Sequence, residues 1–196
     1  GADVNALNED KDSPLNIVTR NGSDNYEFAK ILLKNKANPN ERGKLGSPFH
    51  KLASAEFLQL LIDNGLDQSI RDERNRSALH IHASDIAMMK ILVKDKSNVN
   101  DRDEYYATPL HYSNSVEVIK LLLKKGASLQ EDDEMGRGIL HFPKSKEVLN
   151  FILKKDKSLL NKKMYGWCTP LRSAITFNLD YNWFELLLDH GADLTS

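Results

Sequence analysis

Four histidines recur at nearly regular spacing along the 196-residue chain, at His50, His80, His111 and His141. A close pair such as His80 and His82 could bind a metal ion, because neutral imidazole is a common zinc ligand. No carboxylate or thiolate clusters with this pair to complete a site, and the four recurring histidines stand at one position of a repeated tetrapeptide. The spacing therefore favours a structural role for these histidines, and we expect no metal site.

Cys168 is the single cysteine, so no disulfide can form within the chain. A nucleophilic cysteine needs a base and an electropositive setting. The sequence places neither beside Cys168, and we expect a partly exposed, unreactive thiol. Because the chain also lacks a phosphate-binding glycine loop and the signatures of hydrolases and kinases, we predict that it is not an enzyme and needs no cofactor.

The acidic run at residues 131–134 is a second place where chemistry could be sought. A calcium loop needs ligands that alternate over about twelve residues, with a central glycine and a closing glutamate. The run offers neither of these features. We interpret it as a solvated loop or as one acidic contact point for a basic partner.

Charge and composition exclude several classes of partner. The chain has 28 acidic and 27 basic residues, mixed along its length, and this balance gives no general attraction to nucleic acid or anionic membranes. No apolar stretch approaches the roughly 18 residues that a membrane-spanning helix needs. An apolar fraction of 40% predicts a folded core. We therefore expect no nucleic-acid partner, no membrane insertion and no small-molecule substrate.

A repeated tetrapeptide predicts the start of a helix in each of six units. It reads small polar residue, usually proline, apolar residue, usually histidine. Serine or threonine can cap a helix, and proline suits the first helical position because an N–H there has no partner to lose. The fifth copy begins with Gly138 and lacks both features, so its helix should start least firmly. The six copies occupy residues 13–16, 47–50, 77–80, 108–111, 138–141 and 169–172.

A second pattern follows each tetrapeptide and predicts a longer helix. It has two apolar residues, one polar residue and three apolar residues, at 28–33, 57–62, 88–93, 118–123, 148–153 and 183–188. A helix that is apolar around most of its circumference is covered on several sides, and the lone polar residue should face solvent. A glycine that ends such a helix tolerates the left-handed conformation. At Lys36, Lys96 and Lys157 a lysine replaces this glycine, so the left-handed conformation at the helix end should cost more free energy.

Together the patterns resemble the ankyrin repeat over essentially the whole chain. The resemblance implies an all-α solenoid in which paired antiparallel helices alternate with loop or β-hairpin fingers. Residues 1–5 match the Gly-Ala-Asp-like pattern that closes the later units, so we expect residues 1–12 to be the tail of a preceding repeat. The sequence begins with neither an initiator methionine nor a signal-peptide pattern, so the chain looks cut from a longer one. About six repeats should follow, at 13–46, 47–76, 77–107, 108–137, 138–168 and 169–196.

The middle repeats depart from the family pattern. In repeats two to five, the linker between the two helices is two or three residues short, and Pro143 interrupts the fifth. We expect their inner helices to be little more than one turn long, so that the face they line is shallower or differently curved. Repeats one and six keep longer linkers.

Ankyrin-repeat proteins usually bind other proteins through their finger tips and the face lined by the inner helices. The resemblance therefore implies an interaction scaffold, or alternatively the targeting or autoinhibitory segment of a larger enzyme or effector. Tyrosine, tryptophan and arginine dominate the energetics of interfaces. An alternative role for the aromatic residues is to pack against neighbouring fingers, above all for the two that stand near the usual finger glycine, Tyr106 and Trp167. The candidate partner contacts in the fingers are Arg74, Arg76, Tyr105, Tyr106, Glu134, Arg137, Tyr165 and Trp167.

The abundance of lysine and asparagine bears on localisation. Shortened, divergent repeats of this composition resemble those of ankyrin proteins that intracellular bacteria place in host cells. We therefore expect a cytoplasmic protein, or one that is secreted into a host cytosol.

Overall fold

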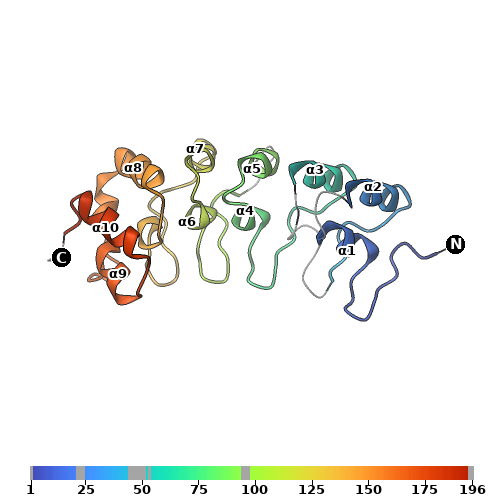
Figure 1. Ribbon diagram of the computed structural model, residues 1–196, viewed down its shortest axis with the longest axis horizontal. Helices are drawn as coiled ribbons and strands as arrows, with labels where there is room; N and C mark the ends of the chain where they lie inside the picture. Colours follow the sequence, from blue (N-terminus) through green and yellow to red (C-terminus); the bar gives the residue numbers. More distant parts are fainter. Residues whose placement is uncertain (1, 21–24, 44–51, 53, 94–97, 194–196) are drawn as a thin grey trace. The chain divides into compact units, whose positions relative to one another are not determined.

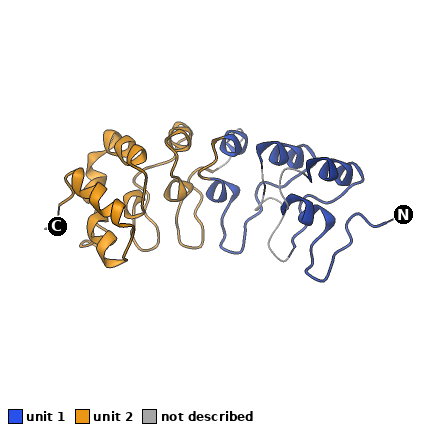
Figure 2. Ribbon diagram, in the orientation of Figure 1, with its two compact units in different colours: residues 1–82, 87–97 blue, residues 83–86, 98–196 orange. Residues whose placement is uncertain are grey.

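The computed structural model describes residues 2–20, 25–43, 52, 54–93 and 98–193 (Figure 1). The chain divides into two compact units, which are coloured separately in Figure 2. Unit 1 comprises residues 1–82 and 87–97, and unit 2 comprises residues 83–86 and 98–196. The regular elements in the described ranges are helices and no β-sheet is formed there, which confirms the all-α prediction.

Unit 1 is built from short helices around an apolar core. Its helices are α1 (Pro14–Arg20), α2 (Tyr26–Lys34), α3 (Ala55–Asp63), α4 (Ala78–Ile81) and α5 (Ile86–Leu92), the last of which begins at the edge of unit 2. Helix α1 packs against α2. Leu15, Phe57 and Met89 are fully buried, as expected for the apolar positions of the two helical patterns.

Unit 2 repeats the same arrangement. It contains α6 (Pro109–Tyr112), α7 (Val116–Lys124), the 3₁₀ helix η3 (Ile139–His141), α8 (Lys146–Lys155), the 3₁₀ helix η4 (Lys157–Asn161), α9 (Pro170–Thr176) and α10 (Tyr181–Asp189). Helix α7 packs against α8, and α9 packs against η3, η4 and α10. In Figure 1, loops extend beyond α6 on the side away from α7, and these loops are the fingers.

The short inner helices of the middle repeats are confirmed where the structure describes them. Helices α4 and α6 have four residues and η3 has three, whereas α1 and α9 have seven. Repeat five has the shortest, because Phe142 is already extended and Pro143 follows it. The tetrapeptide of repeat two, with His50, lies outside the described residues.

The outer helices follow the predicted burial pattern with one exception. The lone polar residue is exposed at Lys30, Lys90, Lys120, Asn150 and Glu185 and half-buried at Gln59. In α2, however, Phe28 is 61% exposed and Ile31 is 58% exposed, so their predicted burial is wrong. This helix buries Ala29 and Leu33 instead, which lie four residues apart on one face.

The helix ends confirm the glycine prediction at most positions. Gly65, Gly126 and Gly191 have φ values of 89°, 94° and 82°. Lys36 has a φ of 68°, so it takes the left-handed conformation at the cost that a side chain imposes. The prediction of an unfavourable helix end at Lys157 is wrong. Helix α8 ends at Asp156, whose backbone is extended, and Lys157 is the first residue of η4. Lys96 lies outside the described residues.

Asparagines in the closing loops join consecutive repeats within each unit. In unit 2, the Asn100 side chain donates to the Gly126 carbonyl at 3.0 Å and accepts from the Ser128 N–H at 3.2 Å. In unit 1, Asn5 makes the equivalent bonds to the Lys36 carbonyl and the Asn38 N–H. Asn40 makes them to the Gly65 carbonyl and the Asp67 N–H. In unit 2, Asn161 accepts from the Asp193 N–H. Asn5, Asn40 and Asn100 thus each satisfy a carbonyl at a helix end and a loop amide of the following repeat, whereas Asn161 satisfies a loop amide.

Candidate functional site: the fingers

Four fingers of the same type each turn around one aspartate or asparagine side chain. In unit 2, Asp103 donates its N–H to the Ala107 carbonyl at 3.1 Å, and its Oδ1 accepts from the N–H groups of Tyr105 and Ala107 at 2.9 and 3.0 Å. Asp72, Asp133 and Asn8 make the same set of contacts in their own fingers. The side chain satisfies backbone donors in a tight loop, which fixes the loop without a β-sheet.

The fourth residue of this turn has a left-handed backbone. The φ value is 59° at Tyr106 and 55° at Asn75, and the equivalent position in the next finger is Gly136, at 70°. An aromatic residue rarely adopts this conformation, because its Cβ approaches the following carbonyl. Tyr106 therefore stands at the finger's glycine position, as predicted, and the surrounding hydrogen bonds maintain its strained backbone.

The second carboxylate oxygen of each finger aspartate has a cationic or phenolic partner. Arg76 donates from Nε to Asp72 at 2.8 Å, and Arg137 donates from Nε to Asp133 at 2.7 Å. Both guanidinium groups therefore stabilise their own fingers, and their predicted contact with a partner stays a prediction. Asp133 is buried, so the interpretation of the acidic run as a solvated loop is wrong at this residue, and the alternative of an acidic contact point stays a prediction for the rest of the run.

Direct contacts hold two fingers of unit 2 side by side. The N–H of Glu134 donates to the carbonyl of Tyr105 at 2.8 Å. Arg102 donates from Nη1 to the carbonyls of Tyr106 and Asp132, both at 2.8 Å, and forms an ion pair with Glu131. We call residues 101–107 and 131–137 the paired fingers. These bonds join the two loops directly, so the paired fingers form one continuous surface.

The third finger of unit 2 is built differently. Met164 and Cys168 exchange backbone hydrogen bonds of 2.9 and 3.1 Å, and the left-handed residues between them are Tyr165 and Gly166. Trp167 lies near the finger glycine as predicted, because it directly follows Gly166. The aromatic residue with a left-handed backbone is Tyr165, however, and not Trp167. The guanidinium carbon of Arg172 lies 5.3 Å from the centroid of the Trp167 ring.

The predicted finger aromatics are exposed in the structure. Exposure is 41% for Tyr105, 59% for Tyr106, 61% for Tyr165 and 49% for Trp167. These four residues and Glu134 and Arg137 belong to unit 2, which brings Tyr105 and Glu134 together through the bond between the paired fingers. Arg74 and Arg76 belong to a finger of unit 1. The structure therefore places the candidate residues on fingers in two units.

The repeated histidines hold the tetrapeptide turns. His111 Nδ1 accepts from the Thr108 N–H at 2.9 Å, and its Nε2 lies 3.2 Å from the Arg137 carbonyl, to which it donates. Because Nδ1 accepts a backbone N–H, the ring is neutral with its hydrogen on Nε2. Burial lowers the pKa of His111 to about 4. His141 makes the same contacts with Gly138 and Cys168, and its pKa is also lowered by burial. The predicted structural role is confirmed at these two positions.

Two further observations concern reactive groups. Cys168 is fully buried, so the expectation of a partly exposed thiol is wrong, and burial raises its pKa. Within the described ranges, no three histidine, cysteine or carboxylate side chains are grouped so that they could hold a metal ion. In the same part of the chain, no helix has the length and apolar character needed to cross a membrane.

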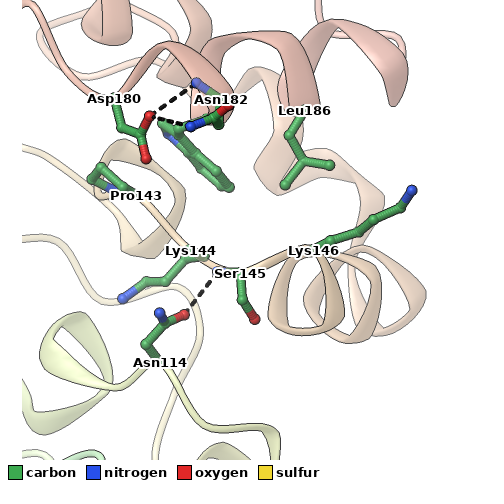
Figure 3. A pocket seen from close by; sticks show the side chains of 9 residues that line it. Asn114, Pro143, Lys144, Ser145, Lys146, Asp180, Asn182 and Leu186 are labelled. Atoms are coloured by element: carbon green, nitrogen blue, oxygen red, sulfur yellow. Dashed lines mark hydrogen bonds between the residues drawn. The ribbon is translucent and has the colours of Figure 1, made fainter.

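A pocket of about 430 Å³ lies in unit 2 at the turns between inner and outer helices. In Figure 3, Pro143, Lys144 and Ser145 lie on one side of it, and Asp180, Asn182 and Leu186 lie on the other. The amino group of Lys144, which lines the pocket, is bound elsewhere, because it donates to the carbonyls of His111 and Ser113, both at 2.8 Å.

Lys144 has a structural role that the sequence patterns do not predict. Its side chain is buried, and burial lowers its pKa to about 7. A lysine directly after a proline, in a linker too short for a helical turn, was the available signal, since the short α6 leaves carbonyls that need a donor.

The comparisons with known proteins support the repeat pattern. A family model described as ankyrin repeats (3 copies) matches residues 49–133. The matched segment includes the finger at 72–76, the finger at 103–107 and the start of the next one. A search of curated proteins gave no match.

Proposed function

Because residues 49–133 consist of ankyrin repeats, a helical repeat that typically serves protein–protein interaction, we propose that this chain binds a partner protein through its finger tips and the face lined by its inner helices. The paired fingers and the finger at residues 164–168 are the contact surface that we propose within unit 2. The finger at residues 72–76, with Arg74 and Arg76, is a separate contact that we propose within unit 1.

The observation that carries this proposal is the exposure of aromatic side chains on loops with a fixed backbone. Tyr105 and Tyr106 project from a turn that four hydrogen bonds of Asp103 maintain. An exposed aromatic ring on a pre-ordered loop loses little conformational entropy when a partner covers it. Such residues are typical interface anchors, whereas an exposed aromatic residue on a mobile loop would bind less tightly.

Binding, rather than catalysis, also fits the titratable groups. His111 and His141 are buried in a neutral, hydrogen-bonded form, and Cys168 is buried with a raised pKa. None of the three is placed to act as an exposed base or nucleophile. We infer that the chain contributes recognition to whatever process it serves.

Affinity capture with matched variants tests the proposal. The wild-type chain and the variant Tyr105→Ala/Tyr165→Ala would each be used as bait in a cell lysate, and retained proteins would be identified by mass spectrometry. Tyr181→Ala is the control, because Tyr181 is exposed in the same unit but lies on α10 rather than on a finger. Circular dichroism melting would establish that all three baits are folded.

We expect a partner that wild type and Tyr181→Ala retain and that the double variant loses. A partner retained equally by all three would move the binding surface away from these fingers. If no bait retains a specific protein, the interaction proposal fails.

A further inference from the structure

The paired fingers carry far more negative charge than the rest of the chain. Residues 101–107 and 131–137 contain seven carboxylates and two arginines, although the whole chain has a net charge of −1. Three cations pair with these carboxylates, Arg102 with Glu131, Arg137 with Asp133 and Lys162 with Asp132, so the carboxylates outnumber the cations by seven to three. Local negative charge attracts basic groups and repels phosphates.

Exposed tyrosines lie within this acidic surface. Tyr105 and Tyr106 follow the exposed residue Glu104, and the hydrogen bond from the Glu134 N–H to the Tyr105 carbonyl connects them with the second finger. A tyrosine face attracts a cation, and a nearby carboxylate can accept its hydrogen bonds. The combination suits a guanidinium better than an ammonium, because a guanidinium can both stack and form paired hydrogen bonds.

Two finger aromatic rings of this chain already have a guanidinium group over one face. The guanidinium carbon of Arg102 lies 5.9 Å from the centroid of the Tyr106 ring, and Arg172 stands over Trp167. Both rings belong to finger tips, both remain about half exposed, and an aromatic ring has two faces. Finger aromatics of this chain therefore accept guanidinium groups at ordinary cation–π distances.

We propose that the paired fingers bind a segment of the partner protein that presents arginine side chains, with Tyr105, Tyr106 and Glu134 as the contacts. This inference rests on the proposed function and specifies its partner chemistry. The third finger does not share this preference, because residues 164–168 contain no carboxylate and the exposed Lys163 precedes them. The arginines of the bound segment accordingly face residues 101–107 and 131–137.

A synthetic peptide tests the inference directly. The probe is a fluorescein-labelled peptide of four Gly-Ser-Arg units, and its matched control replaces each arginine with citrulline, which keeps the shape and removes the charge. Binding to the full chain is measured by fluorescence anisotropy at 50 and 150 mM NaCl. We expect the arginine peptide to bind at least tenfold more tightly than the citrulline peptide, and to weaken with salt.

Two variants separate recognition from general attraction. Glu134→Gln removes a carboxylate of the paired fingers, and Glu147→Gln removes an exposed carboxylate at the start of α8. We expect Glu134→Gln and Tyr105→Ala each to weaken arginine-peptide binding about three- to tenfold, and Glu147→Gln to leave it unchanged. Equal binding of the two peptides, or equal losses in the two glutamate variants, would overturn the inference.

The outcome is distinguishable from a failure of the proposed function. Lysate capture that depends on Tyr105 and Tyr165 would uphold the interaction role even if the arginine peptide did not bind. In that case the partner chemistry alone would be wrong.

Discussion

The Tyr112 hydroxyl donates a hydrogen bond of 2.5 Å to Oδ2 of Asp103, and so takes the place that an arginine occupies in two other fingers. Arg76 and Arg137 reach their aspartates from four residues further along the chain, whereas the equivalent position here is the small residue Ala107. Tyr112 approaches from the end of the inner helix α6 instead. The finger and the inner helix of repeat four are therefore connected by one side chain.

Removing this hydroxyl should destabilise the chain. Tyr112→Phe leaves the buried Asp103 carboxylate without one of its donors, and we expect a loss of about 1–3 kcal/mol in the free energy of unfolding. Urea denaturation followed by circular dichroism measures the change. Tyr181→Phe is the matched control, since it removes an exposed bond to Glu185 and should change stability by less than about 0.5 kcal/mol. Equal effects of the two substitutions would contradict the special role of Tyr112.

The asparagine between repeats should control local opening. Asn100→Ala removes the bonds to the Gly126 carbonyl and the Ser128 N–H, and we expect a destabilisation of about 1–2 kcal/mol. Hydrogen exchange read by NMR should show faster exchange of the Ser128 amide. Lys120→Ala, on the exposed face of α7, is the control and should leave that amide unchanged. Unaltered exchange in Asn100→Ala would show that the loop is held by other contacts.

Lys144 should make stability depend on alkaline pH. Burial lowers the pKa of Lys144 in the folded chain to about 7, from the ordinary lysine value of 10.5, so between these pH values the unfolded chain binds a proton that the folded chain lacks. Stability should consequently rise as pH increases through this window. The variant Lys144→Met lacks this contribution. From pH 7 to pH 10 the unfolding free energy of wild type should therefore increase relative to that of the variant. A difference that is constant with pH would mean that the folded pKa of Lys144 is not lowered.

Relieving the left-handed backbone at Lys36 should stabilise the chain. Lys36→Gly removes the side chain from a position with a φ of 68°, and we expect a gain of about 0.5–1 kcal/mol. Lys34→Gly is the opposing control, because Lys34 is the last residue of α2 and glycine within a helix costs about 1 kcal/mol. Thermal unfolding should move the two melting temperatures in opposite directions. A loss of stability in both variants would show that the Lys36 side chain makes contacts that outweigh its strain.

The sequence predicts the repeats well because they depend on local signals. Helix periodicity, the Ser/Thr-Pro caps and the glycine stops all act within a few residues, and the short linkers are enough to predict that α4, α6 and η3 are about one turn long. The exposure of Tyr105 and Tyr165 follows from their place in the loops.

Contacts that depend on folded geometry could not be predicted in the same way. The aspartates in the fingers have the composition of a solvated acidic loop, and their burial becomes apparent only when Oδ1 meets the backbone donors of the turn. The donation from Lys144 to carbonyls of the preceding repeat joins residues more than thirty positions apart. A second contact of this kind is the bond that His141 Nε2 donates to the carbonyl of Cys168, 27 positions further along the chain.

The aspartate-centred turn separates what keeps a finger folded from what the finger presents. The frame uses the aspartate and the backbone N–H and carbonyl groups of the loop, and these are the same for almost any side chain at the tip. Single substitutions can therefore replace the side chains at positions 104 and 105, or 134 and 135, without loss of the turn. Such a loop can acquire a new recognition specificity in small evolutionary steps, each of which leaves the protein folded.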